Sequence, residues 1–317
     1  MRNPKLFALI TICLWSFGMY LGRLMAINSQ FILLNVSFIF SFIVLMVYTL
    51  VAQGSSIFKK VKFKLAYFLI SPLGYLVYCV GVNQSSRAYD SISETTILNY
   101  TWVIFTIIFT ELLLNKNRKR DRVIQIIEMT GIILGFAAVV VLATQGDFSS
   151  LHINVPGLLW GLAAGVAYGV FSAYSSTVDE ESQGVFLLVG IFMSILLISF
   201  PSLTELELIP ALTWREIGVA FASGGLLSGL GYISWTRANR LARIQNVDIS
   251  SVASLMLVLP FTSLLVSNLF LHESSFLQPY FLVSLALIIL SSVICQKTAV
   301  IAKLFQKRTN PKSPQDL

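Results

Sequence analysis

Apolar residues fill ten runs along the chain, separated by short segments that carry most of the polar side chains. A hydrocarbon core about 30 Å thick takes roughly 20 helical residues to cross. Lipid offers no hydrogen-bond partners to a backbone, so each run is expected to be an α-helix. The pattern predicts an all-α membrane protein with ten transmembrane helices. The ten runs are residues 6–27, 31–51, 65–83, 91–114, 123–143, 156–177, 184–200, 216–236, 247–270 and 278–296.

Glycine recurs at every fourth position in the sixth run, which reads GLLWGLAAGVAYG over residues 157–169. Helices already in lipid associate through close van der Waals packing, and small residues four apart let two backbones approach. The same spacing occurs at Gly131 and Gly135 and at Gly225 and Gly229. The glycine edges therefore predict helix–helix contacts.

Composition agrees with this pattern. The 317 residues are 56% hydrophobic and 12% charged, whereas soluble domains carry about 25% charged residues. Most of the chain is expected to be solvated by lipid.

Basic residues are distributed unevenly between the two sides of the predicted bundle. With the amino terminus inside, only Arg23, Arg87 and Arg215 of the 22 lysines and arginines fall outside. This asymmetry predicts a plasma (inner) membrane protein with both termini cytoplasmic, although the inner segment VDEES at 178–182 is acidic. Since the cations lie beside helix ends, the net charge of +7 does not indicate nucleic-acid binding.

Cysteines and histidines give no sign of a metal or catalytic centre. Cys13, Cys79 and Cys295 fall inside separate runs, and His152 and His272 lie in separate loops. We expect no disulfide, no metal and no cofactor. The sequence contains no GxSxG, HExxH or Walker pattern, so we expect no enzymatic activity.

The chain repeats itself in outline. FTELLLNK at 109–116 and VSNLFLHE at 266–273 close the fourth and ninth runs with the same pattern, which places runs 1–5 on runs 6–10. Since five is odd, the second copy enters the membrane from the other side, as in many secondary transporters. The predicted division is 1–149 for the first repeat, 150–298 for the second and 299–317 for a basic cytoplasmic tail. A channel would show a pore-lining polar repeat or a charged ring instead.

Several short motifs make the resemblance more specific. The five-plus-five arrangement, LWS at 14–16 and the LLL- or LFLHE-like ends of the fourth and ninth runs resemble the drug/metabolite transporter superfamily, EamA type. ETTILNYTW at 94–102, GYISW at 231–235 and the spacing to Pro260 are similar to the YddG-like aromatic amino acid exporters. Where those members commonly have a proline after the tryptophan, this chain has Val103.

The resemblance implies a multi-pass carrier that exports amino acids, aromatic ones among them, or related small metabolites by alternating access. The alternative is an exporter of cationic drugs or a carrier of nucleotide-like metabolites of the same superfamily. The expected partners are a small-molecule substrate and the lipid bilayer, for a monomer or homodimer that does not bind nucleic acid.

Polar and aromatic side chains recur at helical spacing on the fourth, sixth and eighth runs. The third run has a looser stripe of Tyr67, Ser71, Tyr75 and Tyr78. They either face a shared cavity or mediate packing between helices, where Ser and Thr also bond their own backbone. Asn99 and Trp102 favour the cavity, because the resemblance falls on the same residues. The stripe on the sixth run is Trp160, Tyr168, Ser172 and Ser175. The expected lining is Trp15, Tyr78, Asn99, Trp102, Tyr168, Tyr232 and Trp235.

Ionisable residues inside the runs lie near helix ends. Glu94 and Arg23 stand about one turn inside the outer ends of their runs, and reach either to headgroups or to a substrate amine and carboxylate. Glu94 is included in the expected binding site. Glu111 and Glu128 are expected to pair with the basic loop 115–122. Since no ionisable residue is at a run centre, we expect downhill transport or weakly coupled exchange.

Overall fold

The computed structural model describes residues 3–24, 29, 31–61, 63–89, 92–114, 121–271, 278–298 and 300–302. Over these ranges the chain is helical and has no strand. Nine helical stretches of this described part are long and apolar enough to cross a bilayer, and they coincide with nine of the ten predicted runs. An all-α membrane protein is confirmed at this level. Arg23 as a side chain, His272, most of the loop 115–122 and most of the tail 299–317 lie outside the described residues.

Several of the long helices contain a 3-10 or π-helical segment, labelled η. The elements are α1 (Pro4–Trp15), α2 (Gly18–Leu24), α3 (Ile32–Gln53), α4 (Ile57–Lys60), α5 (Leu65–Pro72), η1 (Leu73–Val77), α6 (Tyr78–Tyr89), α7 (Ile92–Leu114), α8 (Arg122–Ala143), η2 (Phe148–Ser150), α9 (Val155–Ser175), α10 (Glu180–Ser202), η3 (Leu203–Ala211), α11 (Trp214–Phe221), η4 (Ala222–Gly231), α12 (Tyr232–Ile244), α13 (Ile249–Ala253), η5 (Ser254–Val258), α14 (Leu259–Leu271) and α15 (Pro279–Gln296).

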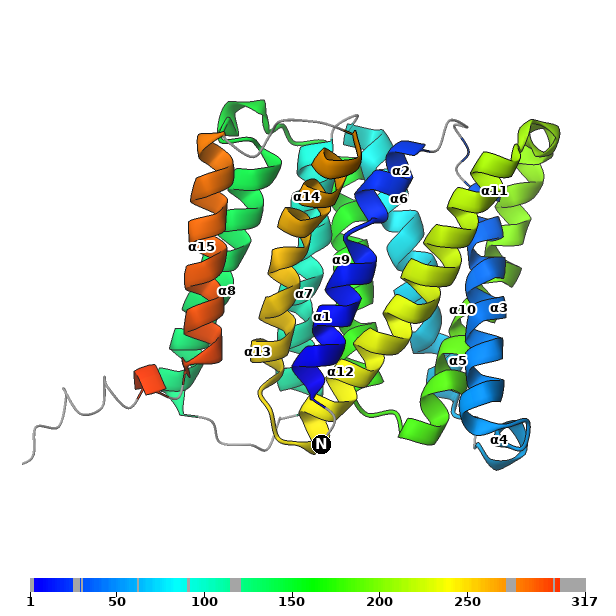
Figure 1. Cartoon of the computed structure of the whole chain (residues 1–317), viewed down its shortest axis with the longest axis horizontal. Coiled ribbons are helices and arrows are strands. Elements are labelled where there is room, and N and C mark those ends of the chain that lie inside the picture. The colour runs from blue at the N-terminus through cyan, green and yellow to red at the C-terminus, as the bar shows by residue number, and fades with distance from the viewer. Residues whose placement is uncertain are drawn as a thin grey trace, which may run out of the picture.

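The first predicted run is broken in the middle. α1 ends at Trp15 and α2 begins at Gly18, and Figure 1 shows the two helices end to end. The Ser16 hydroxyl donates to the Ile12 carbonyl at 2.6 Å and also lies 2.6 Å from the Thr262 hydroxyl of α14. A serine that bonds back to the i−4 carbonyl bends a helix, and here a neighbouring helix holds the bend in place.

The start of α1 and the end of α15 lie at the same end of the bundle (Figure 1). We call this the amino-terminal end and the other the opposite end. α8 and α15 pack against each other on one side, and α3, α10 and α11 form the other side. The remaining long helices lie between these two sides.

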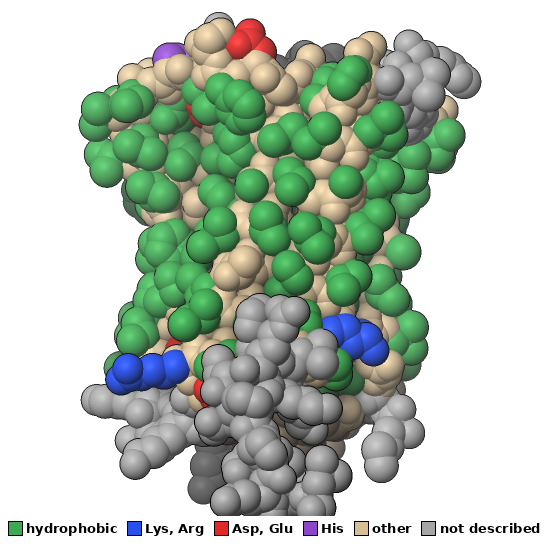
Figure 2. Space-filling model, turned by 90° about the vertical axis from the view of Figure 1, so that its left-hand side faces the viewer, with side chains coloured by type: hydrophobic (Ala, Val, Ile, Leu, Met, Phe, Trp, Pro, Cys, Tyr) green, Lys and Arg blue, Asp and Glu red, His purple; other side chains and the backbone are tan. Residues whose placement is uncertain are grey.

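The outer surface of α8 and α15 is apolar over its height, with basic side chains near its lower edge (Figure 2). Ile126 and Ile133 are 65% and 60% exposed, and Leu282 and Ile289 are 56% and 55% exposed. A continuous apolar surface of this kind is unfavourable in water but is solvated by lipid. The exposed surface therefore agrees with a membrane-embedded bundle.

The glycine edge of α9 lies against α7, as the spacing predicts. A Cβ added at Gly161 would lie 2.7 Å from Leu98 Cβ, and one at Gly169 would lie 2.9 Å from the Phe105 carbonyl carbon. Real Cβ atoms do not come this close to a backbone, so only glycine permits this separation of the helices. We call this contact the glycine seam.

The two other glycine pairs also lie at helix contacts. A Cβ added at Gly131 would lie 2.6 Å from Cys295 Sγ of α15. Gly225 and Gly229 both face Val44 of α3, at 3.1 and 3.0 Å. The prediction that glycine edges mark helix contacts is confirmed for all three.

Candidate substrate cavity

A cavity of about 490 Å³ lies between mid-depth and the opposite end of the bundle. This volume is within the range of small-molecule sites, about 300–1,000 Å³. The walls combine aromatic rings, small apolar residues and hydroxyl groups. The lining residues are Trp15, Gly18, Tyr78, Cys79, Val82, Ser86, Thr95, Thr96, Asn99, Tyr100, Leu227, Ser228, Tyr232, Leu259, Pro260 and Ser263.

Most of the helices around the cavity are irregular at its depth. α1 breaks directly after Trp15, the π-helical η1 precedes Tyr78, the π-helical η4 contains Ser228, and the 3-10 segment η5 precedes Leu259. In membranes, irregular backbone is tolerated where it is buried in protein or lines a cavity, and π-helical turns are frequent at functional sites. Helix irregularity and hollow space therefore coincide here.

The structure separates the eight sequence-predicted site residues into three groups. Trp15, Tyr78, Asn99 and Tyr232 line the cavity. The other three aromatic residues lie beside it in a packed cluster, and Glu94 lies at the opposite end in a separate interaction. The packed aromatic residues are Trp102, Tyr168 and Trp235.

We call the cluster at the floor of the cavity the aromatic layer. Its rings pack mostly edge to face, the arrangement that aromatic pairs favour, with centroids about 4.5–7 Å apart. Trp102, Tyr168, Tyr232 and Trp235 are at most 4% exposed. The layer contains Trp15, Tyr75, Trp102, Tyr168, Tyr232 and Trp235, with centroid distances of 6.3 Å for Trp15–Trp102, 5.4 Å for Trp102–Trp235, 5.6 Å for Tyr168–Tyr232 and 4.4 Å for Tyr75–Tyr232.

Polar atoms of these rings are held by groups on neighbouring helices. Each of three rings donates one hydrogen bond across a helix boundary, which fixes the ring in place. The bonds run from Trp15 Nε1 to the Leu227 carbonyl at 2.9 Å, from the Tyr232 hydroxyl to the Gly74 carbonyl at 2.6 Å, and from Trp235 Nε1 to Ser172 Oγ at 2.9 Å.

Polar contacts continue from the layer toward the amino-terminal end. Asn239 Nδ2 of α12 donates to the Ser172 carbonyl and the Ser175 hydroxyl of α9, both at 3.4 Å. Gln183 Nε2 of α10 donates to the Thr236 carbonyl at 3.0 Å. These bonds join α9, α10 and α12, so the bundle is closed below the layer and hollow above it.

Asn99 brings an amide into the cavity wall from α7. Its Oδ1 atom is buried and has no hydrogen-bond partner. An unpaired buried polar atom costs about 1–3 kcal/mol. A bound molecule that hydrogen-bonds this amide would recover part of that energy.

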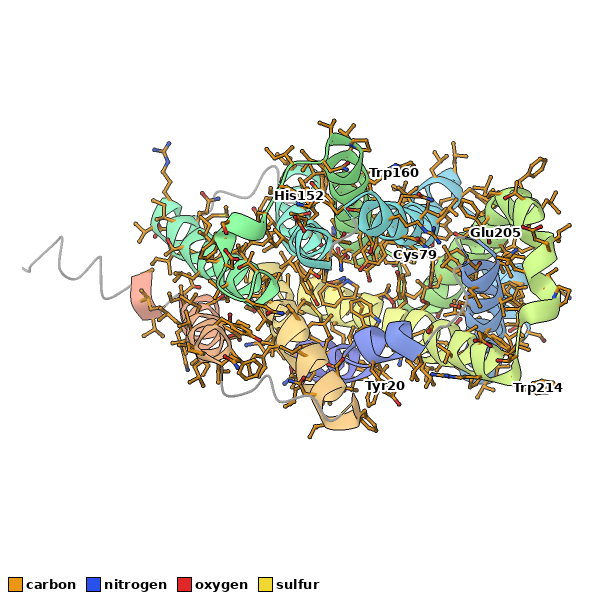
Figure 3. The ribbon with its side chains drawn as sticks, turned by 90° about the horizontal axis from the view of Figure 1, so that it is seen from above. Tyr20, Cys79, His152, Trp160, Glu205 and Trp214 are labelled. Atoms are coloured by element: carbon orange, nitrogen blue, oxygen red, sulfur yellow. The ribbon has the colours of Figure 1, made fainter. Side chains whose placement is uncertain are left out.

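Glu94 is tied to the loop between α8 and α9. Its carboxylate lies 2.8 Å from His152 Nδ1 and accepts the His152 backbone N–H at 3.2 Å. Glu94 does not line the cavity, although Thr95 beside it does. Figure 3 shows His152 over α7 and α9 at the opposite end. The geometry agrees with the interfacial alternative for Glu94 and does not place it near a substrate amine.

Trp160 lies on the outside of α9 and is 44% exposed (Figure 3). This exposure separates Trp160 from Tyr168, which is 1% exposed. The predicted stripe on the sixth run is wrong at Trp160. Tyr168, Ser172 and Ser175 are buried inside the bundle.

Tyr75 is on the loose stripe of the third run but was left out of the expected lining. It is fully buried and stacks on Tyr232 at 4.4 Å with 18° between the ring planes. A second internal repeat also marks this residue, with LGYLVY at 73–78 and LGYISW at 230–235. These copies are as far apart in sequence as Leu112 and Leu269, the residues that align the ends of the fourth and ninth runs.

The glycine of each copy permits a close aromatic contact. A Cβ at Gly74 would lie 2.6 Å from Phe171 Cδ2 of α9, and a Cβ at Gly231 would lie 2.8 Å from Trp15 Cδ1 of α1. Both glycines are in π-helical segments, η1 and η4. The two copies therefore share sequence, backbone irregularity and the type of neighbour.

No family model and no curated protein matches this chain. A solved crystal structure, described only as that of a protein, is similar over 96% of this chain and 99% of its own, with a TM-score of 0.76 and 18% sequence identity. At this identity the likeness shows the fold alone.

Proposed function

We propose that this protein is a secondary carrier of the drug/metabolite transporter superfamily, EamA type. It exports amino acids, aromatic ones among them, or related small metabolites by alternating access. The main observation behind the proposal is that the bundle is hollow toward one end and packed toward the other. A cavity of about 490 Å³ reaches from mid-depth toward one end, while the aromatic layer and the bonds of α9, α10 and α12 close the other.

Helix contacts support two inverted five-helix repeats, with α1 and α2 together as the first span. An in-plane two-fold axis relates spans 1–5 to spans 6–10 and exchanges equivalent contacts. α3 packs on η4 as α10 packs on α5, and α6 packs on α9 as α12 packs on α1. α8 and α15, the fifth and tenth spans, pack on each other. Tyr75 and Tyr232 meet where this axis would pass.

The cavity suits an organic molecule with a flat apolar part. Trp15, Tyr78, Tyr100 and Tyr232 contribute aromatic surface, and Asn99 contributes an amide. The protein changes the side of the membrane on which the molecule lies, and no chemical step is assigned to it. We propose that it works as a monomer or homodimer.

The positions of the cations support cytoplasmic termini in the inner membrane. Lys59, Lys60 and Arg243 lie at the amino-terminal end, while Arg87 and Arg215 lie toward the opposite end. By the positive-inside rule the amino-terminal end is cytoplasmic. The cavity then faces outward in this structure, which is the state that follows release of an exported molecule.

Counterflow of radiolabelled phenylalanine into proteoliposomes tests the function. We expect saturable uptake that aromatic amino acids inhibit. Stronger inhibition by tetraphenylphosphonium or by uridine monophosphate would favour the cationic-drug or nucleotide alternative instead. If neither saturable uptake nor inhibition occurs with correctly folded protein, the carrier proposal is wrong.

A variant of the lining makes the test specific. Asn99→Leu keeps the approximate volume and removes the amide, so uptake is expected to fall by about tenfold, as for loss of one hydrogen bond. Thr130→Val is the control, because Thr130 is exposed on α8 and bonds its own helix at Ile126. Equal uptake by both variants would remove Asn99 from the site.

A further inference from the structure

The two copies of the LGY repeat are bonded unequally. The Tyr232 hydroxyl donates to the Gly74 carbonyl at 2.6 Å. Its counterpart, the Tyr75 hydroxyl, is buried and has no hydrogen-bond partner, although the two rings are stacked. An inverted pair that is alike in sequence therefore makes one of two equivalent bonds.

The missing bond has an acceptor of the same kind. If Tyr75 behaved as Tyr232 does, its hydroxyl would donate to the carbonyl of Gly231. Gly231 lies in π-helical η4, as Gly74 lies in π-helical η1. A π-helical turn departs from the regular i→i−4 ladder, and a carbonyl oxygen has two lone pairs, so it accepts a second hydrogen bond.

We infer that Tyr75 and Tyr232 form a two-position hydrogen-bond switch. Tyr232 donates to Gly74 while the cavity faces the opposite end, and Tyr75 donates to Gly231 when the cavity faces the amino-terminal end. The inference rests on the proposed alternating-access function. In each state one tyrosine lines the cavity and donates a hydrogen bond, and the other is buried without a partner. Since each state makes one of the two equivalent bonds, the pair does not stabilise one state over the other.

The alignment of the two LGY copies also explains why some predicted site residues are buried outside the present cavity lining. It exchanges residues of the present lining with residues in or beside the aromatic layer, which would line the cavity in the second state. The exchanged pairs are Tyr78 with Trp235, Leu259 with Trp102, and Cys79 with Thr236.

The last pair supplies matched reporters for the two states. Cys79 lines the present cavity, while Thr236 is 1% exposed. The native thiol at 79 reports the state described here, in a background of Cys13→Ala and Cys295→Ala. Cys79→Thr with Thr236→Cys, in the same background, reports the other state. The readout is the labelling rate of the full chain in micelles by a charged thiol reagent.

Two substitutions that each remove one tyrosine hydroxyl should shift the labelling rates in opposite directions. Tyr232→Phe removes the bond of the present state, so labelling at position 236 rises and labelling at Cys79 falls. Tyr75→Phe removes the bond of the second state and does the reverse. Each shift is expected to be about two- to tenfold, the population change that corresponds to one hydrogen bond. Tyr67→Phe, on α5 away from the pair, should change neither rate.

The outcomes separate this inference from the proposed function. If the thiol of Thr236→Cys reacts, but both phenylalanine variants move the rates in the same direction or in neither, the switch is wrong and the carrier stands. If that thiol never reacts in any variant while Cys79 does, there is no second state, and the carrier proposal itself fails.

Discussion

Two contacts that the inverted arrangement would make equivalent are packed differently. α9 meets α7 along the glycine seam, where Gly169 brings the α9 backbone within contact of Phe105. The counterpart contact joins α1 and α2 to α14. There the hydroxyls of Ser16 and Thr262, 2.6 Å apart, and the Tyr20–Phe270 ring pair at 5.1 Å hold the helices together.

The cavity lies on the side of the second contact. Gly18 of α2 and Leu259, Pro260 and Ser263 of α14 belong to its lining, whereas Gly161, Gly165 and Gly169 do not. The seam excludes hollow space because backbones meet directly, while larger side chains keep α2 and α14 apart. In the state described here, α1, α2 and α14 border hollow space, and we call them the adjustable wall. α7 and α9 meet without hollow space along the seam, and we call them the fixed wall of this state.

The largest effect is expected where the fixed wall meets the aromatic layer. Trp102→Ala leaves a hole between α7 and α9, where Trp102 packs on Tyr168 at 5.0 Å, and should lower the free energy of unfolding by about 3–5 kcal/mol. Leu259 is at the equivalent position of the adjustable wall and borders the existing cavity, so Leu259→Ala should lower the free energy of unfolding by less. Unfolding in mixed micelles measures both, and equal losses would contradict the distinction between the walls.

A smaller effect is expected from one methyl group in the seam. Gly169→Ala places its Cβ against Phe105, and overpacking should cost about 1–3 kcal/mol. Gly18→Ala meets only Leu227 Cδ1 at an ordinary 3.7 Å and should stay within about 0.5 kcal/mol of the parent. Thermal unfolding in detergent compares them. A Gly18→Ala protein less stable than Gly169→Ala would reverse the assignment of the two walls.

Loosening the adjustable wall should change access more than stability. Ser16→Ala removes the bonds to Ile12 and Thr262 and should cost about 1 kcal/mol. Because the wall moves more freely, the native thiol of Cys79 should react faster with a charged reagent. An unchanged rate, with stability lowered as expected, would show that the α1–α2 break does not control entry.

The smallest effect is expected at the opposite end of α7. Glu94→Gln weakens the interaction with His152, whose side chain is 56% exposed, so the free energy of unfolding should fall by no more than about 1 kcal/mol. Transport of amines should be unaffected. A double-mutant cycle with His152→Gln isolates the pair, and loss of amine selectivity in Glu94→Gln would return Glu94 to the substrate site.

The positions of the spans could be predicted because a membrane-spanning helix needs about 20 consecutive, mostly apolar residues, which are visible in the sequence. The glycine contacts were predictable for a similar reason, since a missing Cβ at every fourth position has one structural use in lipid. The break at Ser16 was not predictable. Neither Ser16 nor Phe17 is a strong helix breaker, and the bend depends on Thr262, far away in the sequence.

The site was predictable in part. Tyr78, Asn99 and Tyr232 follow from polar and aromatic stripes, and Trp15 belongs to the LWS motif of the resemblance. The structure brings these four residues to one cavity. The stripes do not tell which residues line the cavity in one conformation and which are buried beside it. Trp102 and Trp235 could therefore not be distinguished from the lining residues. Glu94 depended on a loop contact that hydropathy does not encode. Tyr75 is on the loose stripe of the third run, and comparing the two LGY copies singles it out from that stripe.

The aromatic layer has a spectroscopic consequence. Of the five tryptophans, Trp15, Trp102 and Trp235 are in the layer, while Trp160 and Trp214 are 44% and 87% exposed on the surface. Replacing the two surface indoles by phenylalanine would leave intrinsic emission that arises from the layer alone. Parting of these rings would admit water and shift the emission to longer wavelength, so a conformational change at the layer could be followed in real time without an added dye.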